Sequence, residues 1–93
     1  MNVSVHFLGI LSEFVGAKRA AFDLPEGARY ADLLTAIGRR FGPNMPRQLW
    51  NQEENTFNAP IAATRDEKSL APVGDSELNQ DDEIKIFLMA AGG

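Results

Sequence analysis

The feature that most constrains the fold is one long amphipathic helix, predicted near the middle of a short chain. Its apolar residues are Tyr30, Leu33, Leu34, Ile37 and Phe41. They recur at i, i+3, i+4, i+7 and i+11, which places them on a single helical face. Gly42 and Pro43 then end the pattern. In a chain of 93 residues, a helix with one apolar face is typical of a helix packed on a sheet.

Alternating apolar and polar residues predict that strands lie on both sides of this helix. The strand patterns cover residues 3–8, 19–24, 60–64, 69–73 and 84–89. In the first of them Val3, Val5 and Phe7 are expected to face the core. In the last, the core-facing set is expected to be Ile84, Ile86 and Leu88.

The order of these elements predicts an α+β fold. If the first and last strands are parallel neighbours, the helix supplies the crossover that parallel pairing requires. We therefore expect a β-grasp (ubiquitin-like) roll over residues 1–89, in which a mixed sheet of four to five strands packs on one main helix. Residues 90–93 are expected to form a flexible C-terminal Gly-Gly tail. Residues 43–58 are predicted to contain a turn or a mobile loop between Trp50 and Phe57.

Composition excludes several classes of function. The chain has no Cys, which excludes a disulfide scaffold, a thiolate metal site and a thiol nucleophile. With a single His, at position 6, a zinc site or a Ser-His triad is not expected, and His6 is interpreted as a surface residue. The acidic run 81–83 is interpreted as a solvated turn, so no metal site is predicted.

Charge and hydropathy give expectations about partners and location. The formal net charge is −4, so neither nucleic acid nor an anionic membrane is an expected partner. Residues 48–93 carry most of the acidic side chains and would suit a basic docking surface. The sequence shows no apolar run long enough for a membrane span and no signal peptide pattern, so a cytoplasmic location is expected.

The C-terminal sequence Ala90-Ala91-Gly92-Gly93 is the strongest functional signal. Glycine lacks a Cβ, so such an end can enter a narrow channel that excludes other residues. With no Cys and one His, the carboxylate of Gly93 is the one distinctive reactive group. The alternative interpretation is an ordinary frayed end.

Several motifs resemble one family. They are Val3–Leu8, Glu13–Gly16, Leu24–Ala28, Ala31–Leu34, and the run from Asp81 through Phe87 to Gly92-Gly93. On these motifs the chain resembles the ubiquitin-like sulfur carriers, and within them the small subunit of molybdopterin synthase and related proteins. Arg29 stands where that family often has a Thr that caps the helix, and Met89-Ala90-Ala91 replaces a Pro-rich approach to the glycines.

The resemblance implies a chemistry that partner enzymes carry out on the tail. An E1-like adenylating (MoeB/ThiF-type) enzyme would use ATP to activate Gly93, which follows Gly92. A sulfur donor would then convert the carboxylate to a thiocarboxylate. That group would donate sulfur in molybdopterin (molybdenum/tungsten cofactor) biosynthesis, at a molybdopterin synthase large subunit or another sulfur-accepting enzyme. The chain would be a co-substrate, with no cofactor bound and no activity expected of it alone.

A docking face is expected beside the tail. Phe87 and Met89 alternate with the core residues of the last strand, and Leu8 would join them from the first strand. With Ala90 and Ala91 they are the predicted partner-binding residues, and the resemblance implies that this face docks both partner enzymes. Alternatively, the segment with Trp50 and Phe57 could cover the face. Two other functions stay open, a ubiquitin-like modifier conjugated to lysines through the same tail and a non-catalytic β-grasp interaction domain.

Overall fold

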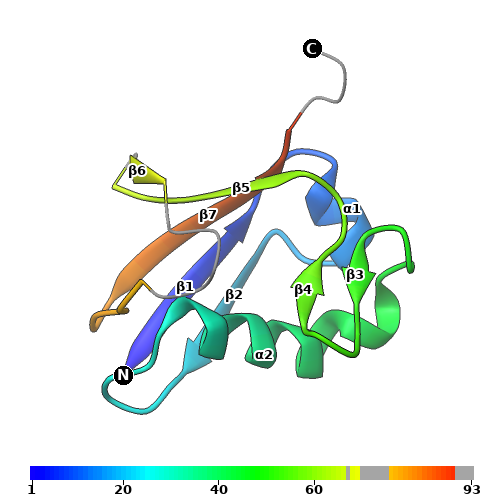
Figure 1. The fold of residues 1–93 in the computed structure, drawn as a ribbon. Coiled ribbons are helices and arrows are strands. Elements are labelled where there is room, and N and C mark those ends of the chain that lie inside the picture. The colour runs from blue at the N-terminus through cyan, green and yellow to red at the C-terminus, as the bar shows by residue number, and fades with distance from the viewer. Residues whose placement is uncertain (67, 70–75, 90–93) are drawn as a thin grey trace.

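A computed structural model describes residues 1–66, 68–69 and 76–89, which form a mixed five-stranded sheet with one long helix across one face (Figure 1). The sheet strands are β1 (Asn2–Phe7), β2 (Arg19–Asp23), β5 (Ile61–Arg65), β6 (Lys68–Ser69) and β7 (Asp82–Leu88). The helices are α1 (Leu11–Val15), α2 (Tyr30–Phe41) and the 3-10 helix η1 (Gly42–Asn44). A separate hairpin consists of β3 (Trp50–Asn51) and β4 (Thr56–Phe57).

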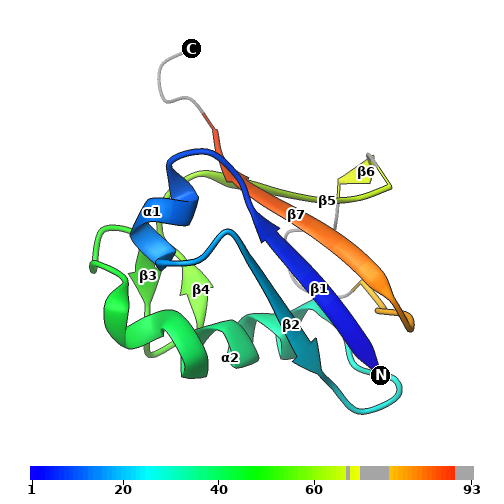
Figure 2. The same ribbon diagram turned by 180° about the vertical axis from the view of Figure 1, so that it is seen from behind.

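The first and last strands are parallel neighbours at the centre of the sheet. The strand order is β2-β1-β7-β5-β6, and only the β1–β7 pair is parallel (Figure 2). In that pair Val5 lies beside Ile84 and Phe7 beside Ile86. The crossover between them contains α2, as parallel pairing requires. The predicted α+β class and β-grasp topology are therefore confirmed.

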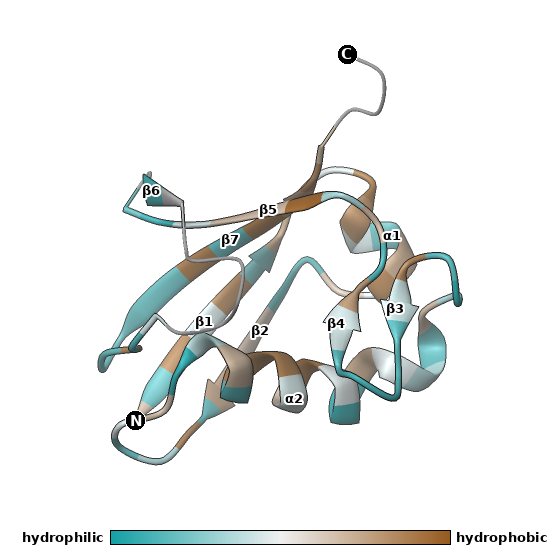
Figure 3. Ribbon diagram, in the orientation of Figure 1, coloured by the Kyte–Doolittle hydropathy of each residue, from teal (hydrophilic) through white to brown (hydrophobic). Residues whose placement is uncertain are grey.

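The core forms between the inner face of the sheet and the apolar face of α2 (Figure 3). Ile84 and Ile86 are fully buried, as are Leu33 and Ile37 of the helix. Phe41 completes the helical face, and its ring meets the ring of Phe7 edge-on with 5.7 Å between centroids. Alternation in the strands and helical periodicity thus identified the two surfaces that pack together.

The helix begins and ends where its sequence predicts. The Asp32 carboxylate accepts a hydrogen bond of 2.8 Å from the backbone N–H of Arg29, which satisfies one free amide of the first turn. Arg39 and Arg40 lie in the last turn, where positive charge is favourable. After Phe41 the chain tightens into η1, which holds Pro43 in its first turn.

Within residues 43–58 the chain forms the β3–β4 hairpin, which the sequence did not predict. Trp50 is 2% exposed and stacks edge-on against Phe57, with ring centroids 4.8 Å apart. The side-chain oxygen of Asn51 accepts hydrogen bonds from the backbone N–H groups of Glu53 and Glu54 and so stabilises the turn. Of the two interpretations, the structure shows the turn, which joins β3 to β4.

The hairpin packs so closely on α2 that Gly38 has no room for a side chain. A Cβ there would lie 2.5 Å from Asn55 Oδ1 and 2.8 Å from Trp50 Cζ2. We expect Gly38→Ala to lower the free energy of unfolding by about 1–2 kcal/mol, because overpacking outweighs the helix propensity gained. Thr35→Ala, at a half-exposed position of the same helix, should not destabilise. Urea unfolding checks this, and a stabilised Gly38→Ala protein would contradict the packing.

Burial of Tyr30 makes the stability of the fold depend on pH in the alkaline range. Its side chain lies in the core at 3% exposure, and burial raises the pKa of its hydroxyl from 10.0 to about 12. The folded state favours the neutral hydroxyl. The contribution of Tyr30 to the free energy of unfolding is therefore complete below pH 10 and is lost as pH rises through about 12. The loss is on the order of 3 kcal/mol.

This alkaline loss can be measured cleanly because the chain contains a single tyrosine. Ultraviolet absorbance of the phenolate should show Tyr30 ionising together with unfolding near pH 12, and Tyr30→Phe should remove the corresponding part of the stability loss. Ionisation of Tyr30 near pH 10 in the folded protein would contradict its burial.

Candidate functional site

The predicted reactive residues lie outside the described part of the chain. Gly92 and Gly93 do so, as do Ala90 and Ala91, and their roles and the expected tail over residues 90–93 stay predictions. The structure describes the chain as far as Met89, the first residue after β7. The backbone N–H of Met89 donates a hydrogen bond of 3.0 Å to the carbonyl of Pro60. The sheet therefore fixes the chain four positions before Gly93.

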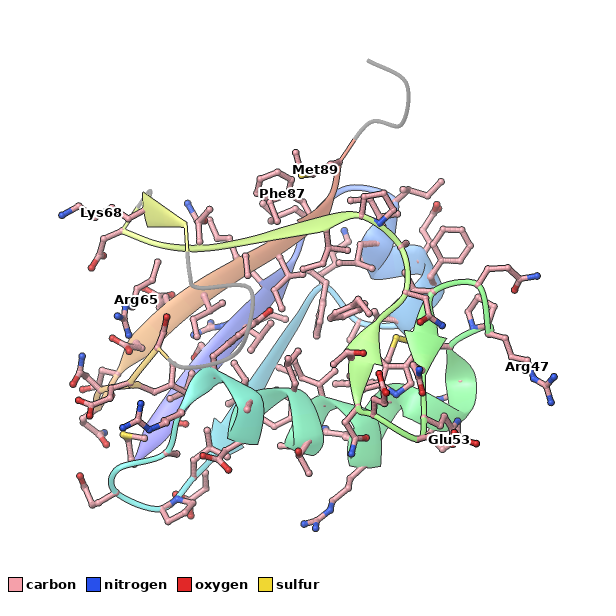
Figure 4. The ribbon with its side chains drawn as sticks, in the orientation of Figure 1. Arg47, Glu53, Arg65, Lys68, Phe87 and Met89 are labelled. Carbon is pink, nitrogen blue, oxygen red and sulfur yellow. The ribbon has the colours of Figure 1, made fainter. Side chains whose placement is uncertain are left out.

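The predicted docking residues gather on the sheet face opposite α2, at the carboxyl end of β7. Figure 4 shows Phe87 and Met89 together there, on the side away from the helix. Met89 is 54% exposed, Leu8 is 38% exposed and Phe87 is partly exposed. The backbone N–H of Leu8 donates to the carbonyl of Ile86, which places Leu8 beside the last strand. The structure thus brings together the three predicted residues that it describes.

The structure adds Ile10 to this surface. Ile10 is 56% exposed, and a hollow of about 370 Å³ is lined by Leu8, Gly9, Ile10, Phe87 and Leu88. We call Leu8, Ile10, Phe87 and Met89 the apolar patch. Exposed apolar groups clustered in this way typically mark a protein-binding surface.

A second hollow lies close by on the other side of Leu88. Its volume is about 340 Å³, and Phe14, Pro46, Gln48, Leu49, Ala59 and Leu88 line it. Phe14 is 42% exposed, because α1 buries Leu11 and Val15 and leaves Phe14 on its outer side. The exposure of Phe14 could have been predicted from the sequence. Leu11 and Val15 are four residues apart and share one helical face, and Phe14, three residues after Leu11, lies at the margin of that face.

The hairpin does not cover the apolar patch. Trp50 lies against Gly38 and Gly42 of the helical segment, and with Leu49 it belongs to the core on the helix side of the sheet. The alternative in which Trp50 and Phe57 fold over the outer sheet face is therefore wrong. Among the described residues, no helix lies over the outer face of the sheet.

Two titratable residues of the central strands, His6 and Asp82, form structural pairs. His6 Nε2 lies 3.0 Å from Glu83 Oε1, and the His6 side chain is 27% exposed. Asp82 is not a residue of a solvated turn, because it begins β7, is 14% exposed and pairs with Arg65 at 2.8 Å. Within residues 1–66, 68–69 and 76–89, no group of three acidic, His or Cys side chains could hold a metal ion. In the same residues no helix has the length and apolar character to cross a membrane.

Comparisons with known proteins find the fold but no close sequence relative. No protein-family model and no curated protein sequence matches the chain. The structure of SAMP1 from Haloferax volcanii matches with a TM-score of 0.78 and 19% identity, over 100% of both chains. A Pyrococcus furiosus protein, provisionally described as molybdopterin converting factor subunit 1, matches at 0.72 and 20%, over 97% of this chain and 99% of its own.

A eukaryotic protein has the same architecture. Urm1 from Trypanosoma brucei matches with a TM-score of 0.70 and 19% identity, over 99% of this chain and 95% of its own. These similarities span whole chains and agree with the family that the sequence motifs resemble. At this identity they establish the fold, and the chain is a β-grasp protein with the architecture of the small modifier and Urm1 proteins.

Proposed function

We propose that this protein is a ubiquitin-like sulfur carrier whose reactive group is the carboxylate of Gly93. The observation that carries the proposal is the place where β7 ends. Strand β7 lies at the sheet centre, a backbone hydrogen bond to Pro60 holds the next residue, Met89, and Met89 belongs to an exposed apolar patch. A partner that binds this patch would hold the four residues that follow within reach of its own active site.

The chemistry follows from the weakness of a carboxylate as an electrophile. An oxygen of the Gly93 carboxylate attacks the α-phosphorus of ATP, the bond to the bridging oxygen breaks, and pyrophosphate leaves. A hydrosulfide donor then attacks the carbonyl carbon of the acyl-adenylate, AMP departs, and one proton is released. The product is a thiocarboxylate, which passes its sulfur to an acceptor while water restores the carboxylate. The chain contributes the acyl group and the docking surface, and an E1-like enzyme contributes catalysis.

Within this function we place the chain in molybdopterin synthesis. Support comes from the sequence motifs and from the likeness to the Pyrococcus furiosus protein. The acceptor would then be a pterin precursor held by a molybdopterin synthase large subunit, and ATP would be bound by the activating enzyme rather than by this chain.

A modifier role is the second candidate, because two of the similar structures are small archaeal modifier proteins from Haloferax volcanii and Methanosarcina acetivorans. Both functions need the same adenylate and differ in the nucleophile that attacks it. Incubation of the chain with the E1-like enzyme of its own organism, ATP and sulfide should yield the thiocarboxylate. If lysine-linked adducts form on other proteins and no thiocarboxylate does, the modifier role replaces the carrier role.

A further inference from the structure

The outer face of the sheet carries a row of basic side chains directly beside the apolar patch. In β1, His6 is paired with Arg19 of β2 on one side and with Lys85 of β7 on the other. Side chains of residues paired directly across a sheet point to the same face. Arg19, His6 and Lys85 therefore form one row across three adjacent strands, which Figure 2 shows side by side.

The row and the apolar patch are neighbours along β1 and β7. Leu8 lies two positions beyond His6, and Phe87 two positions beyond Lys85. Two residues of a strand span roughly 7 Å, so the cationic row lies within one side-chain length of the apolar contact. A partner that covers Leu8 and Phe87 would therefore also come close to this row.

Two of the three basic groups have positive charge available for a partner. Glu83 lies beside the row, and its carboxylate is 3.0 Å from His6 Nε2. The Arg19 guanidinium donates to the hydroxyl of Ser4 at 3.4 Å, a neutral partner that leaves the charge uncompensated. Lys85 is exposed and has no ion pair among the residues that the structure describes.

This local charge is opposite to the charge of the whole chain. The chain carries a formal net charge of −4, and residues 48–93 hold most of its acidic groups. That imbalance would suit a basic docking surface, yet the face beside the apolar patch presents Arg19 and Lys85. Local charge determines which partner surface is complementary.

We infer that the E1-like adenylating enzyme of the proposed function docks on this face with an apolar contact flanked by its own carboxylates, which pair with Arg19 and Lys85. The inference rests on that proposed function. A second copy of this chain fits less well, because a symmetric pair formed by this face brings two cationic rows together. The row would then steer association and fix the orientation in which the tail enters the enzyme.

The test is a charge reversal with a matched control. The double variant Arg19→Glu/Lys85→Glu and the control Arg47→Glu/Lys68→Glu change the charge equally, and all four side chains are exposed. Arg47 and Lys68 lie away from Phe87 (Figure 4). Association with the enzyme in stopped-flow measurements should slow at least about tenfold for the double variant at low salt, and much less near 1 M salt. The control should associate like the unmodified protein.

Other outcomes separate the inference from the function on which it rests. Arg19→Gln/Lys85→Gln should give an intermediate loss, and it serves as the variant if the double reversal does not fold. If the unmodified chain is adenylated and both double reversals associate alike, the inference is wrong and the proposed function stands. If the unmodified chain is not adenylated by the enzyme, the proposed function fails and the inference with it. A concentration-dependent dimer that the Arg19 and Lys85 changes abolish would assign the face to a second copy instead.

Discussion

Replacement of Phe87 by Glu is expected to weaken binding of the activating enzyme by at least about 100-fold, or roughly 3 kcal/mol. Phe87 lines the hollow of the apolar patch, next to Leu8 and Ile10. A partner that fills this hollow must remove water from it, and a carboxylate enclosed there without a partner loses its hydration. The effect should appear mainly in the dissociation rate, because the enclosed contact is formed only after encounter.

The fold should survive this change, because Phe87 faces away from the core residues Ile84 and Ile86. Ala31→Glu is the matched control. It adds the same carboxylate at an exposed position of α2, on the opposite side of the sheet, and should leave binding unchanged. Isothermal titration with each variant checks both results. Loss of folding for Phe87→Glu would place the residue in the core, and undiminished affinity would exclude the apolar patch as the docking surface.

Elements with a long and regular pattern could be predicted from the sequence. The apolar face from Tyr30 to Phe41 defined α2, whose bounds match. Alternation also predicted β1 and β7, and it separated Phe87 and Met89 from the core residues on the other face. These patterns succeed because each follows from the geometry of one element and needs no knowledge of its partner.

Elements defined by distant contacts could not be predicted in this way. Each strand of the β3–β4 hairpin has two residues, too few to show alternation. The packing of Trp50 on Gly38 holds the hairpin in place, and sequence periodicity does not reveal such a contact. Asp82 was interpreted as solvated because it lies in an acidic run, but pairing with Arg65 of β5 makes it structural. For the predicted strand over 69–73, the structure describes only the short β6 (Lys68–Ser69), and residues 70–73 lie outside it.

The candidate site combines a part that the structure describes with a part known from sequence alone. Strand alternation identified Leu8, Phe87 and Met89, and the fold places them on one surface. Ile10 was missed because it precedes α1 and belongs to no periodic pattern. The chemistry of Gly93 rests on residue identity and on the resemblance, so a direct chemical experiment must test it.

Deletion of Gly93 is expected to abolish sulfur loading while leaving the fold intact. The described sheet and core do not include this residue, so the free energy of unfolding should hardly change. The deletion moves the carboxylate back by up to about 3.5 Å along an extended chain. In-line attack on a phosphorus atom tolerates little misplacement, and a loss of at least about 100-fold in adenylation is expected.

A chain with one extra glycine after Gly93 is the matched control for this deletion. It keeps every original residue and displaces the carboxylate by the same distance in the opposite direction. The same loss is expected if position matters, whereas a loss confined to the deletion would mean that Gly93 is needed for contacts rather than for reach. Adenylation is measured as the pyrophosphate released in the presence of the E1-like enzyme of the same organism.

The most direct test is intact-protein mass spectrometry after incubation with that enzyme, ATP and sulfide. The unmodified chain should gain the mass of one oxygen-to-sulfur exchange, and fragmentation should place the sulfur on Gly93. Neither the truncated nor the extended chain should gain it. An unmodified chain that stays unchanged with an active enzyme, or a truncated chain that accepts sulfur equally well, would contradict the assignment of this protein as a sulfur carrier.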